Sequence, residues 1–238
     1  MPTARLAPVA LPMLARPEVA PEFPSALYAA RVERLRERAA ARGYDHLVVY
    51  ADREHSANLA YLTGFDPRFE EAILVLGQSG RPVLLAGNEC IGLARVAPLP
   101  VEAVLLQELS LPSQPRDRSK PLADILAEAG IARGARVGVV GWKAPRDRSW
   151  IEAPAFLVDT LRSGVGPGGS VVNATDLLID AADGLRVINE PEQIAAFEHA
   201  SCETSTGVRN LLFGLRPGMR SAKPSSSSNG AAPRCRVT

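Results

Sequence analysis

The stretch ANLAYLTGFDPRFEEAILVL, residues 57–76, changes from a helical pattern through a turn to a continuous apolar run. Taken with the preceding DREHS, its first part predicts a helix that is capped by Asp52 and ends near Gly64. A second apolar run begins directly after the turn-rich segment Gln78–Arg81, so the two runs predict a β-hairpin. A helix, a loop and a hairpin are therefore expected in this order.

Apolar runs and helical spacings alternate on both sides of this stretch. The first helix is expected to end at Gly43, a residue type that commonly terminates helices. Four apolar side chains recur at helical spacing before it, namely Tyr28, Val32, Leu35 and Ala39. Further strands are expected at residues 46–51, 101–106 and 136–142. Further helices are expected at residues 88–97, 120–130 (capped by Ser119) and 153–164. Residues 170–186 are expected to form a strand and a short helix. The alternation predicts an α/β fold in which helices flank a mixed β-sheet.

Composition divides the chain into four segments. Residues 1–24 are rich in Pro and Ala and are expected to form an extended arm. Residues 25–186 contain the alternating pattern of the α/β domain. Residues 187–219 begin with a capping-box-like spacing of Asn189 and Glu192 and predict one long helix. Residues 220–238, rich in Ser, Pro, Gly and Ala, predict a disordered low-complexity tail.

The overall composition excludes several classes of protein. With 238 residues, of which 46% are hydrophobic and 22% charged, the chain has the composition of a soluble globular protein. A net charge of +1 gives no reason to expect nucleic acid as a partner. No run approaches the about 18 apolar residues of a membrane span. Three widely spaced cysteines without a C-x-x-C pair favour a reducing compartment, and we expect a cytoplasmic protein.

The residues alone reveal no catalytic constellation and no metal site. The sequence lacks a dinucleotide-binding G-x-G-x-x-G, a P-loop and a G-x-S-x-G elbow. His46, His55 and His199 do not have the spacing that places two imidazoles on one helix face toward a metal. His46, which opens a strand, is interpreted as structural. Of the clustered carboxylates in TDLLIDAAD, Asp176 is interpreted as a helix cap.

Two stretches together resemble a known family. Asn58 and the run Tyr61–Phe65 match the helix that ends in Tyr-Leu-Thr-Gly-Phe in the N-terminal domain of the creatinase, prolidase and Xaa-Pro aminopeptidase family. The later stretch DGLRVINEPEQIAAFEHASCETSTGVRNLLFGLRPGM, residues 183–219, is similar to the entry of that family into its catalytic domain. The resemblance covers about residues 27–219.

The resemblance implies a creatinase-like N-terminal α/β domain over residues 25–186, followed at residues 187–219 by the first helix of a pita-bread catalytic domain. In the family that second domain holds two divalent metals (Mn, Co or Zn) through two Asp, one His and two Glu, and it hydrolyses peptides. Residues 220–238 contain no Asp, Glu or His. We therefore expect a truncated catalytic domain, no metal cofactor in this chain, and no peptidase activity of the chain alone.

The resemblance also implies a role for the N-terminal domain, which packs on a catalytic domain, often that of a dimer partner, and walls its substrate pocket. On this basis Tyr61, Phe65 and Arg68 are candidates for the pocket wall. For Tyr61 the interpretation as a core residue is preferred to this one, and for Phe65 and Arg68 the two interpretations stand side by side. Partners are expected to be a second copy or a catalytic domain, with a peptide-like substrate only when that domain is supplied.

Other functions stay open. The chain is alternatively a binding or dimerisation module that pairs with a full-length relative without catalysis. Within the family, a fragment of a creatinase-like or ectoine-hydrolase-like amidohydrolase is a further alternative, and an unrelated α/β enzyme is a third. The apolar positions of the helix at residues 190–213 predict higher mobility or contact with another copy.

Overall fold

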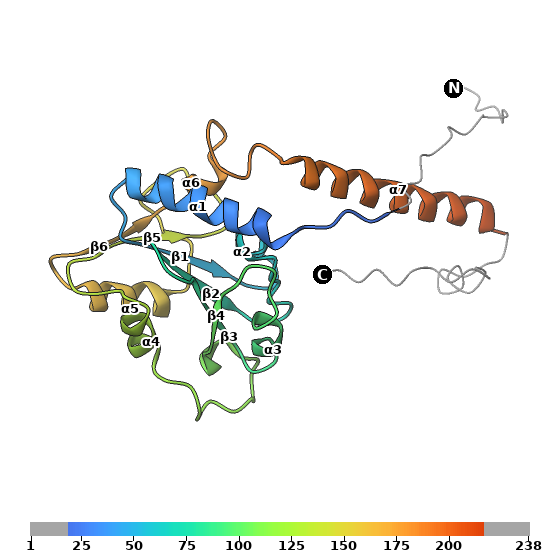
Figure 1. The fold of residues 1–238 in the computed structure, drawn as a ribbon. Coiled ribbons are helices and arrows are strands. Elements are labelled where there is room, and N and C mark those ends of the chain that lie inside the picture. The colour runs from blue at the N-terminus through green and yellow to red at the C-terminus, as the bar shows by residue number, and fades with distance from the viewer. Residues whose placement is uncertain (1–18, 217–238) are drawn as a thin grey trace, which may run out of the picture. The chain divides into compact units, whose positions relative to one another are not determined.

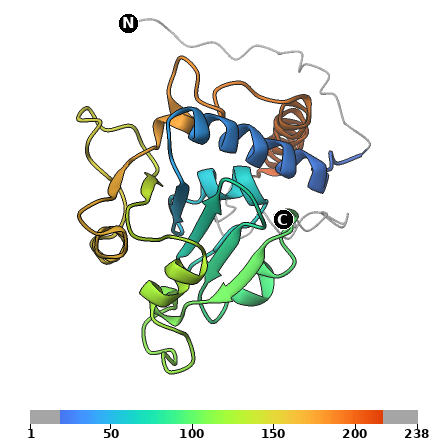
Figure 2. The ribbon, with the colours of Figure 1, turned by 60° about the vertical axis from the view of Figure 1, so that its left-hand side comes forward.

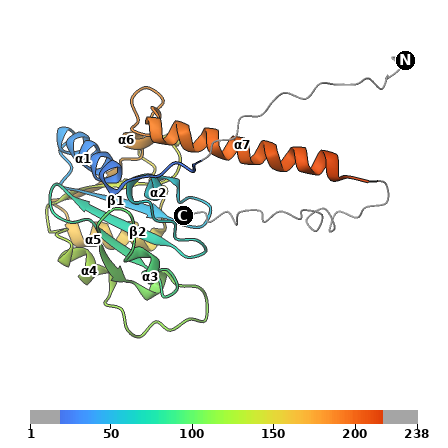
Figure 3. The same ribbon diagram turned by 45° about the vertical axis from the view of Figure 1, so that its right-hand side comes forward.

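The computed structural model describes residues 19–216, which belong to two units. The first is an α/β unit of residues 23–188, and the second contains one long helix, α7 (Pro191–Gly214), which Figure 3 shows as an uninterrupted rod. The fold class predicted from the sequence is confirmed. The predicted tail, and the arm up to residue 18, lie outside the described residues.

A six-stranded mixed sheet forms the centre of the α/β unit, in the order β4-β3-β2-β1-β5-β6. The pairs β1–β2 and β2–β3 are antiparallel, and the remaining neighbours are parallel. The predicted hairpin is therefore confirmed as β2–β3, and its turn contains Gly80 at φ +81°. The strands are β1 (His46–Ala51), β2 (Ala72–Gly77), β3 (Val83–Ala86), β4 (Glu102–Leu105), β5 (Arg136–Val140) and β6 (Ser170–Asn173).

Helices cover both faces of this sheet, with α1 on one face and α4 and α5 on the other (Figure 1, Figure 2). The helices of the unit are α1 (Ser25–Ala41), α2 (Ala57–Thr63), α3 (Ile91–Ala94), α4 (Leu122–Glu128), α5 (Ala155–Val165) and α6 (Asp176–Ile179), with a 3-10 turn at Gln107–Leu109.

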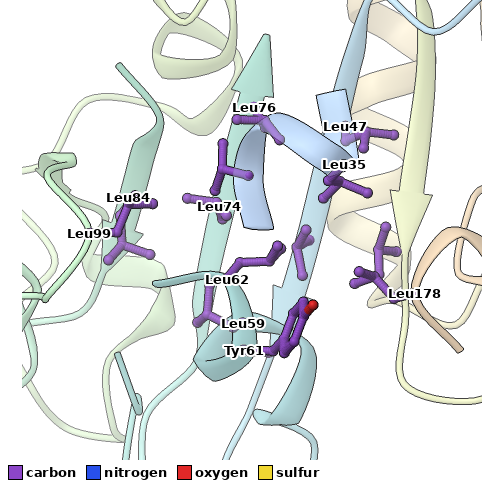
Figure 4. Packing of buried hydrophobic residues seen from close by; sticks show 14 of the residues in the cluster. Leu35, Leu47, Leu59, Tyr61, Leu62, Leu74, Leu76, Leu84, Leu99 and Leu178 are labelled. Atoms are coloured by element: carbon purple, nitrogen blue, oxygen red, sulfur yellow. The ribbon is translucent and has the colours of Figure 1, made fainter. Parts of the chain in front are cut away.

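The sheet separates two hydrophobic clusters. Along β1, Leu47 and Val49 belong to the cluster beneath α1 and α2, whereas Val48 and Tyr50 belong to the cluster beneath α4 and α5. Figure 4 shows leucines of α1, α2 and the strands meeting in the first cluster. Because β1 and β2 are buried on both faces, they read as continuous apolar runs in the sequence rather than as alternating ones.

Helix α1 buries the apolar residues that its spacing predicted, and it also buries an arginine. Arg31 is 2% exposed, and its guanidinium lies 4.2 Å from the centroid of the Tyr61 ring. Nη1 of Arg31 also donates a hydrogen bond to the carbonyl oxygen of Tyr61 at 2.8 Å. The cation therefore fastens α1 to α2 through both a ring and a backbone acceptor.

The predicted helix caps are wrong in position. Helix α2 begins at Ala57, and Oδ1 of Asp52 instead accepts hydrogen bonds from the backbone of Glu54 and His55 in a turn. Oγ of Ser119 accepts a hydrogen bond from the backbone of Gln107 rather than capping α4.

The two remaining predicted caps also differ from the observed ones. Asp176 lies inside α6 and forms an ion pair with Arg42. The capping box of α7 is formed by Glu190 and Gln193, one position later than predicted.

Candidate functional site

The two motifs that carry the resemblance meet in space. Nη1 of Arg186 donates a hydrogen bond to Oδ1 of Asn58 at 2.6 Å. Nδ2 of Asn58 donates to the carbonyl oxygen of Gly141, at the end of β5, also at 2.6 Å. Asn58 is 3% exposed, and burial lowers the pKa of Arg186. We call Asn58, Gly141 and Arg186 the exit clamp, since one buried amide satisfies both a carbonyl and a desolvated guanidinium.

Two further hydrogen bonds extend the exit clamp. The Tyr61 hydroxyl donates to the carbonyl oxygen of Leu185 at 3.2 Å. The backbone N–H of Gly141 donates to Oγ1 of Thr175 at 2.8 Å. Side chains of α2 and backbone carbonyls of α6 therefore hold Leu185 and Arg186 in place, a few residues before α7 begins in the sequence.

The end of α2 and the loop after it contain the three residues predicted for the pocket wall. Tyr61 is 6% exposed and Phe65 is 3% exposed, and both belong to the hydrophobic cluster beneath α1. Arg68 is exposed, with φ +62°, and its backbone N–H donates to Oδ1 of Asp66. The structure thus brings Tyr61 and Phe65 together in the core and places Arg68 at the surface. Their contribution to a pocket wall stays a prediction.

Hydrogen bonds join this loop to α3. The buried carboxylate of Glu70 accepts hydrogen bonds from the backbone of Glu89 at 3.2 Å and of Cys90 at 2.9 Å. The thiol of Cys90 donates to the carbonyl oxygen of Pro67 at 3.0 Å, and burial raises its pKa to about 12. The loop and α3 therefore form one continuous piece of surface.

This surface carries exposed apolar side chains that sequence reasoning missed. Phe69 is 48% exposed, and on α3 and its end Leu93 and Val96 are 47% and 75% exposed. Arg68 and Arg95 are exposed beside them. We call these five residues the loop–α3 surface. A signal was available in the sequence, because Leu93 and Val96 are three residues apart and so share one side of a helical turn.

Within residues 19–216, no three His, Cys, Asp or Glu side chains are arranged to hold a metal ion. No helix in that range combines the length and the apolarity that crossing a bilayer requires.

The fold and the joined motifs define a class, the N-terminal α/β domains of pita-bread peptidases. Residues 31–188 match the family described as the Creatinase/Prolidase N-terminal domain, which is two thirds of the chain. The chain belongs to this family. A search among curated proteins finds no match.

Solved structures with the same fold are dipeptidases and prolidases. The dipeptidase PepE from Mycobacterium ulcerans is 20% identical with a TM-score of 0.54, over 85% of this chain and 48% of that one. The prolidase from Thermococcus sibiricus is 17% identical with a TM-score of 0.57, over 83% and 47%. The Xaa-Pro dipeptidase from Bacillus anthracis is 14% identical with a TM-score of 0.53, over 83% and 46%. The chain spans about half the length of these relatives.

Proposed function

We propose that the α/β unit is a non-catalytic docking domain of a metal-dependent peptidase of the Xaa-Pro dipeptidase or aminopeptidase type. In this proposal the loop–α3 surface binds a catalytic domain, in a dimer or in a complex with a full-length relative. Arg68 and Phe69 then wall the substrate pocket. The observation that carries the proposal is the exposure of Phe69, Leu93 and Val96 on a loop and helix that are hydrogen-bonded to each other.

The chemistry of the loop–α3 surface suits a protein partner. Aromatic residues and arginines are enriched at protein interfaces, and the loop–α3 surface offers Phe69 with Arg68 and Arg95. The loop is also rigid for its position, because a buried carboxylate, that of Glu70, holds it to α3. A preorganised surface loses little conformational entropy on binding, which favours a specific complex.

The exit clamp supports the same arrangement. It holds the chain at Leu185 and Arg186, and the resemblance makes the next helix, α7, the first of the catalytic domain. A fixed exit limits where a following domain can lie, and so serves a domain whose work depends on its placement.

The cofactor, substrate and location form the rest of the proposal. Two divalent metals and a peptide ending in Xaa-Pro are assigned to the catalytic domain, as the resemblance implies, and we expect the chain alone to cleave nothing. A cytoplasmic location is supported by Cys90 and Cys202, which are both free thiols.

Light scattering on the full chain tests the docking role. We expect a dimer, or a complex with an added prolidase catalytic domain, that Phe69→Ser with Val96→Ser weakens at least about tenfold, because two apolar anchors are lost. The matched control is Phe156→Ser, since Phe156 is a similarly exposed aromatic on α5. A strictly monomeric chain without affinity for a catalytic domain contradicts the proposal.

An activity assay tests the second half of the proposal. The chain is incubated with Gly-Pro and, in turn, Mn²⁺, Co²⁺ and Zn²⁺, and release of proline is measured. We expect none above background. A robust metal-dependent Gly-Pro-cleaving activity that co-purifies with the chain would overturn the assignment of catalysis to another domain.

A further inference from the structure

A hollow of about 310 Å³ lies beside the end of β1 and the start of β2. Three segments line it, residues 52–55, 69–71 and 109–112. Its volume falls at the lower end of the range of about 300 to 1,000 Å³ that small-molecule sites occupy. The hollow is formed within the α/β unit, so it is complete without a second domain.

One wall of the hollow contains a paired histidine. Nδ1 of His55 lies 2.9 Å from Oδ1 and 3.1 Å from Oδ2 of Asp52. The His55 ring also stacks on the indole of Trp142, with centroids 4.3 Å apart and planes at 25°. The carboxylate and the indole together hold the imidazole in one orientation. Nδ1 faces Asp52, and Nε2 is the other ring nitrogen.

The floor of the hollow holds the carboxyl group of Glu71, one oxygen of which has no hydrogen-bond partner within the described part of the chain. Oε2 of Glu71 is buried, and no hydrogen-bond partner for it exists among the described residues. Burial raises the pKa of Glu71 and the nearby Asp52 carboxylate adds to this rise, whereas a hydrogen bond with the Tyr50 hydroxyl and the charge of Arg116 act against it. Burial, with the carboxylates of Glu71 and Asp52 beside it, also raises the pKa of Tyr50. The carboxyl groups of Glu71 and Asp52 thus lie close together at the hollow, and a positive charge placed beside them is favoured.

The other groups of the lining set the sign and shape of a ligand. The carboxylate of Glu70 is already bonded to backbone N–H groups, whereas that of Glu54 is exposed. Arg53 is the arginine of the lining and is paired with Glu54 at 3.6 Å, and the charge of Arg116 also acts on Glu71. The half-exposed ring of Phe69 and the apolar chain at residues 109–112 add an apolar side.

We propose that this hollow binds a small primary ammonium ion carried on an apolar or aromatic skeleton. The ammonium donates hydrogen bonds to the carboxylates of Glu71 and Asp52, the former after a small side-chain rotation, and the skeleton lies against Phe69. A carboxylate ligand of the same shape is repelled by the acidic floor. This site goes beyond the proposed docking function and does not depend on it, because all of its groups belong to the α/β unit.

Trp142 provides a direct readout of binding, since its indole stacks on the histidine of the site. The chain has two tryptophans, so Trp150→Phe leaves Trp142 as the single fluorophore. Trp150 is 65% exposed, and its replacement is expected to leave the fold intact. Phenethylammonium chloride is titrated into this variant of the full chain, with phenylacetate and 2-phenylethanol as the anionic and neutral ligands of matching shape.

We expect a saturable change of Trp142 emission with phenethylammonium and none with phenylacetate. Glu71→Gln, which keeps the size of the side chain, is expected to weaken binding at least about tenfold, because a charge-assisted hydrogen bond is lost. The control Glu128→Gln removes the same charge from an exposed ion pair with Lys120 and is expected to change binding less than about twofold.

Three results would overturn the proposal. They are the absence of a saturable change, equal binding of phenylacetate and phenethylammonium, or equal effects of Glu71→Gln and Glu128→Gln. If Glu71→Gln does not fold, as judged by circular dichroism, Asp52→Asn replaces it with the same expected loss. None of these measurements uses a catalytic domain, so a failure here is distinct from a failure of the docking proposal.

Discussion

Replacing Asn58 by alanine tests the exit clamp most sharply. The side chain makes two hydrogen bonds of 2.6 Å, one of them to the guanidinium of Arg186. A neutral hydrogen bond contributes about 0.5 to 1.5 kcal/mol and one to a charged group about 1.5 to 3 kcal/mol. We therefore expect Asn58→Ala to lower the free energy of unfolding by about 2 to 4 kcal/mol. That is a large share of the about 5 to 15 kcal/mol that stabilises a typical domain.

The loss arises from the partners that remain. In the variant the carbonyl oxygen of Gly141 loses its donor and the half-buried guanidinium of Arg186 loses its acceptor, and each bears a desolvation cost. Urea denaturation followed by circular dichroism measures the effect. Asn189→Ala is the matched control, because Asn189 is exposed and its loss is expected to cost less than about 0.5 kcal/mol.

A double-mutant cycle separates the clamp from simple cavity formation. Arg186→Met keeps most of the volume of the side chain and removes the charge. If Asn58 and Arg186 act as a pair, the two changes together cost less than the sum of the single costs, by about 1.5 to 3 kcal/mol. A single loss below about 1 kcal/mol for Asn58→Ala, or strict additivity with Arg186→Met, refutes the clamp as a coupled unit.

Three further predictions follow from single residues. Gly64→Ala is expected to lower the free energy of unfolding, measured by urea denaturation, by at least about 2 kcal/mol. Gly64 has φ +70°, and a Cβ added there lies 2.6 Å from the Pro98 ring. An unchanged free energy of unfolding would show that the turn relaxes freely. Burial lowers the pKa of His46 from 6.5, so the unfolded chain takes up a proton at this residue more readily than the folded chain. The contribution of neutral His46 to the free energy of unfolding is therefore present above pH 6.5 and lost as the pH falls below it. Urea midpoints at pH 7.5 and 5.5 are expected to differ more in the native chain than in His46→Gln, and equal differences would contradict the assignment. Cys90 is 1% exposed, and the pKa of its thiol is raised to about 12. It is expected to react with iodoacetamide far more slowly than the partly exposed Cys202, as measured by peptide mass spectrometry. Equal rates in the folded chain would show that the loop–α3 contact opens.

Periodic patterns predicted the elements well because they report burial along a short stretch of chain. The run His46–Ala51 is apolar throughout since side chains of both faces are covered, and its identity as a strand is confirmed. Caps were predicted less well, because a cap depends on which partner a short polar side chain finds. Asp52 bonds in a turn with His55, Ser119 bonds Gln107, and Asp176 pairs with Arg42. The partners of Ser119 and Asp176 lie outside the helices that the sequence assigned to these residues, and Asp52 bonds its neighbours in a turn that ends before α2 begins.

The candidate site shows the same limit. A loop has no periodicity, so its sequence does not tell which of its side chains face inward. In the loop after α2, Phe65 is buried, whereas Phe69, four residues further on, is exposed. The hollow was not predicted at all, since it joins three segments that are distant in the sequence.

Composition, periodicity and two short motifs were sufficient to establish the α/β class of this chain and its resemblance to creatinase and prolidase N-terminal domains. These are properties of neighbouring residues, whose preferences act over one or two turns of chain. The tertiary structure alone showed that Asn58 and Arg186, 128 positions apart, share a hydrogen bond, and that His55 and Trp142 stack beside a carboxyl-lined hollow. Such contacts depend on how the whole sheet closes between its two helical layers, and a buried polar group takes as its partner whichever donor or acceptor that closure brings within reach.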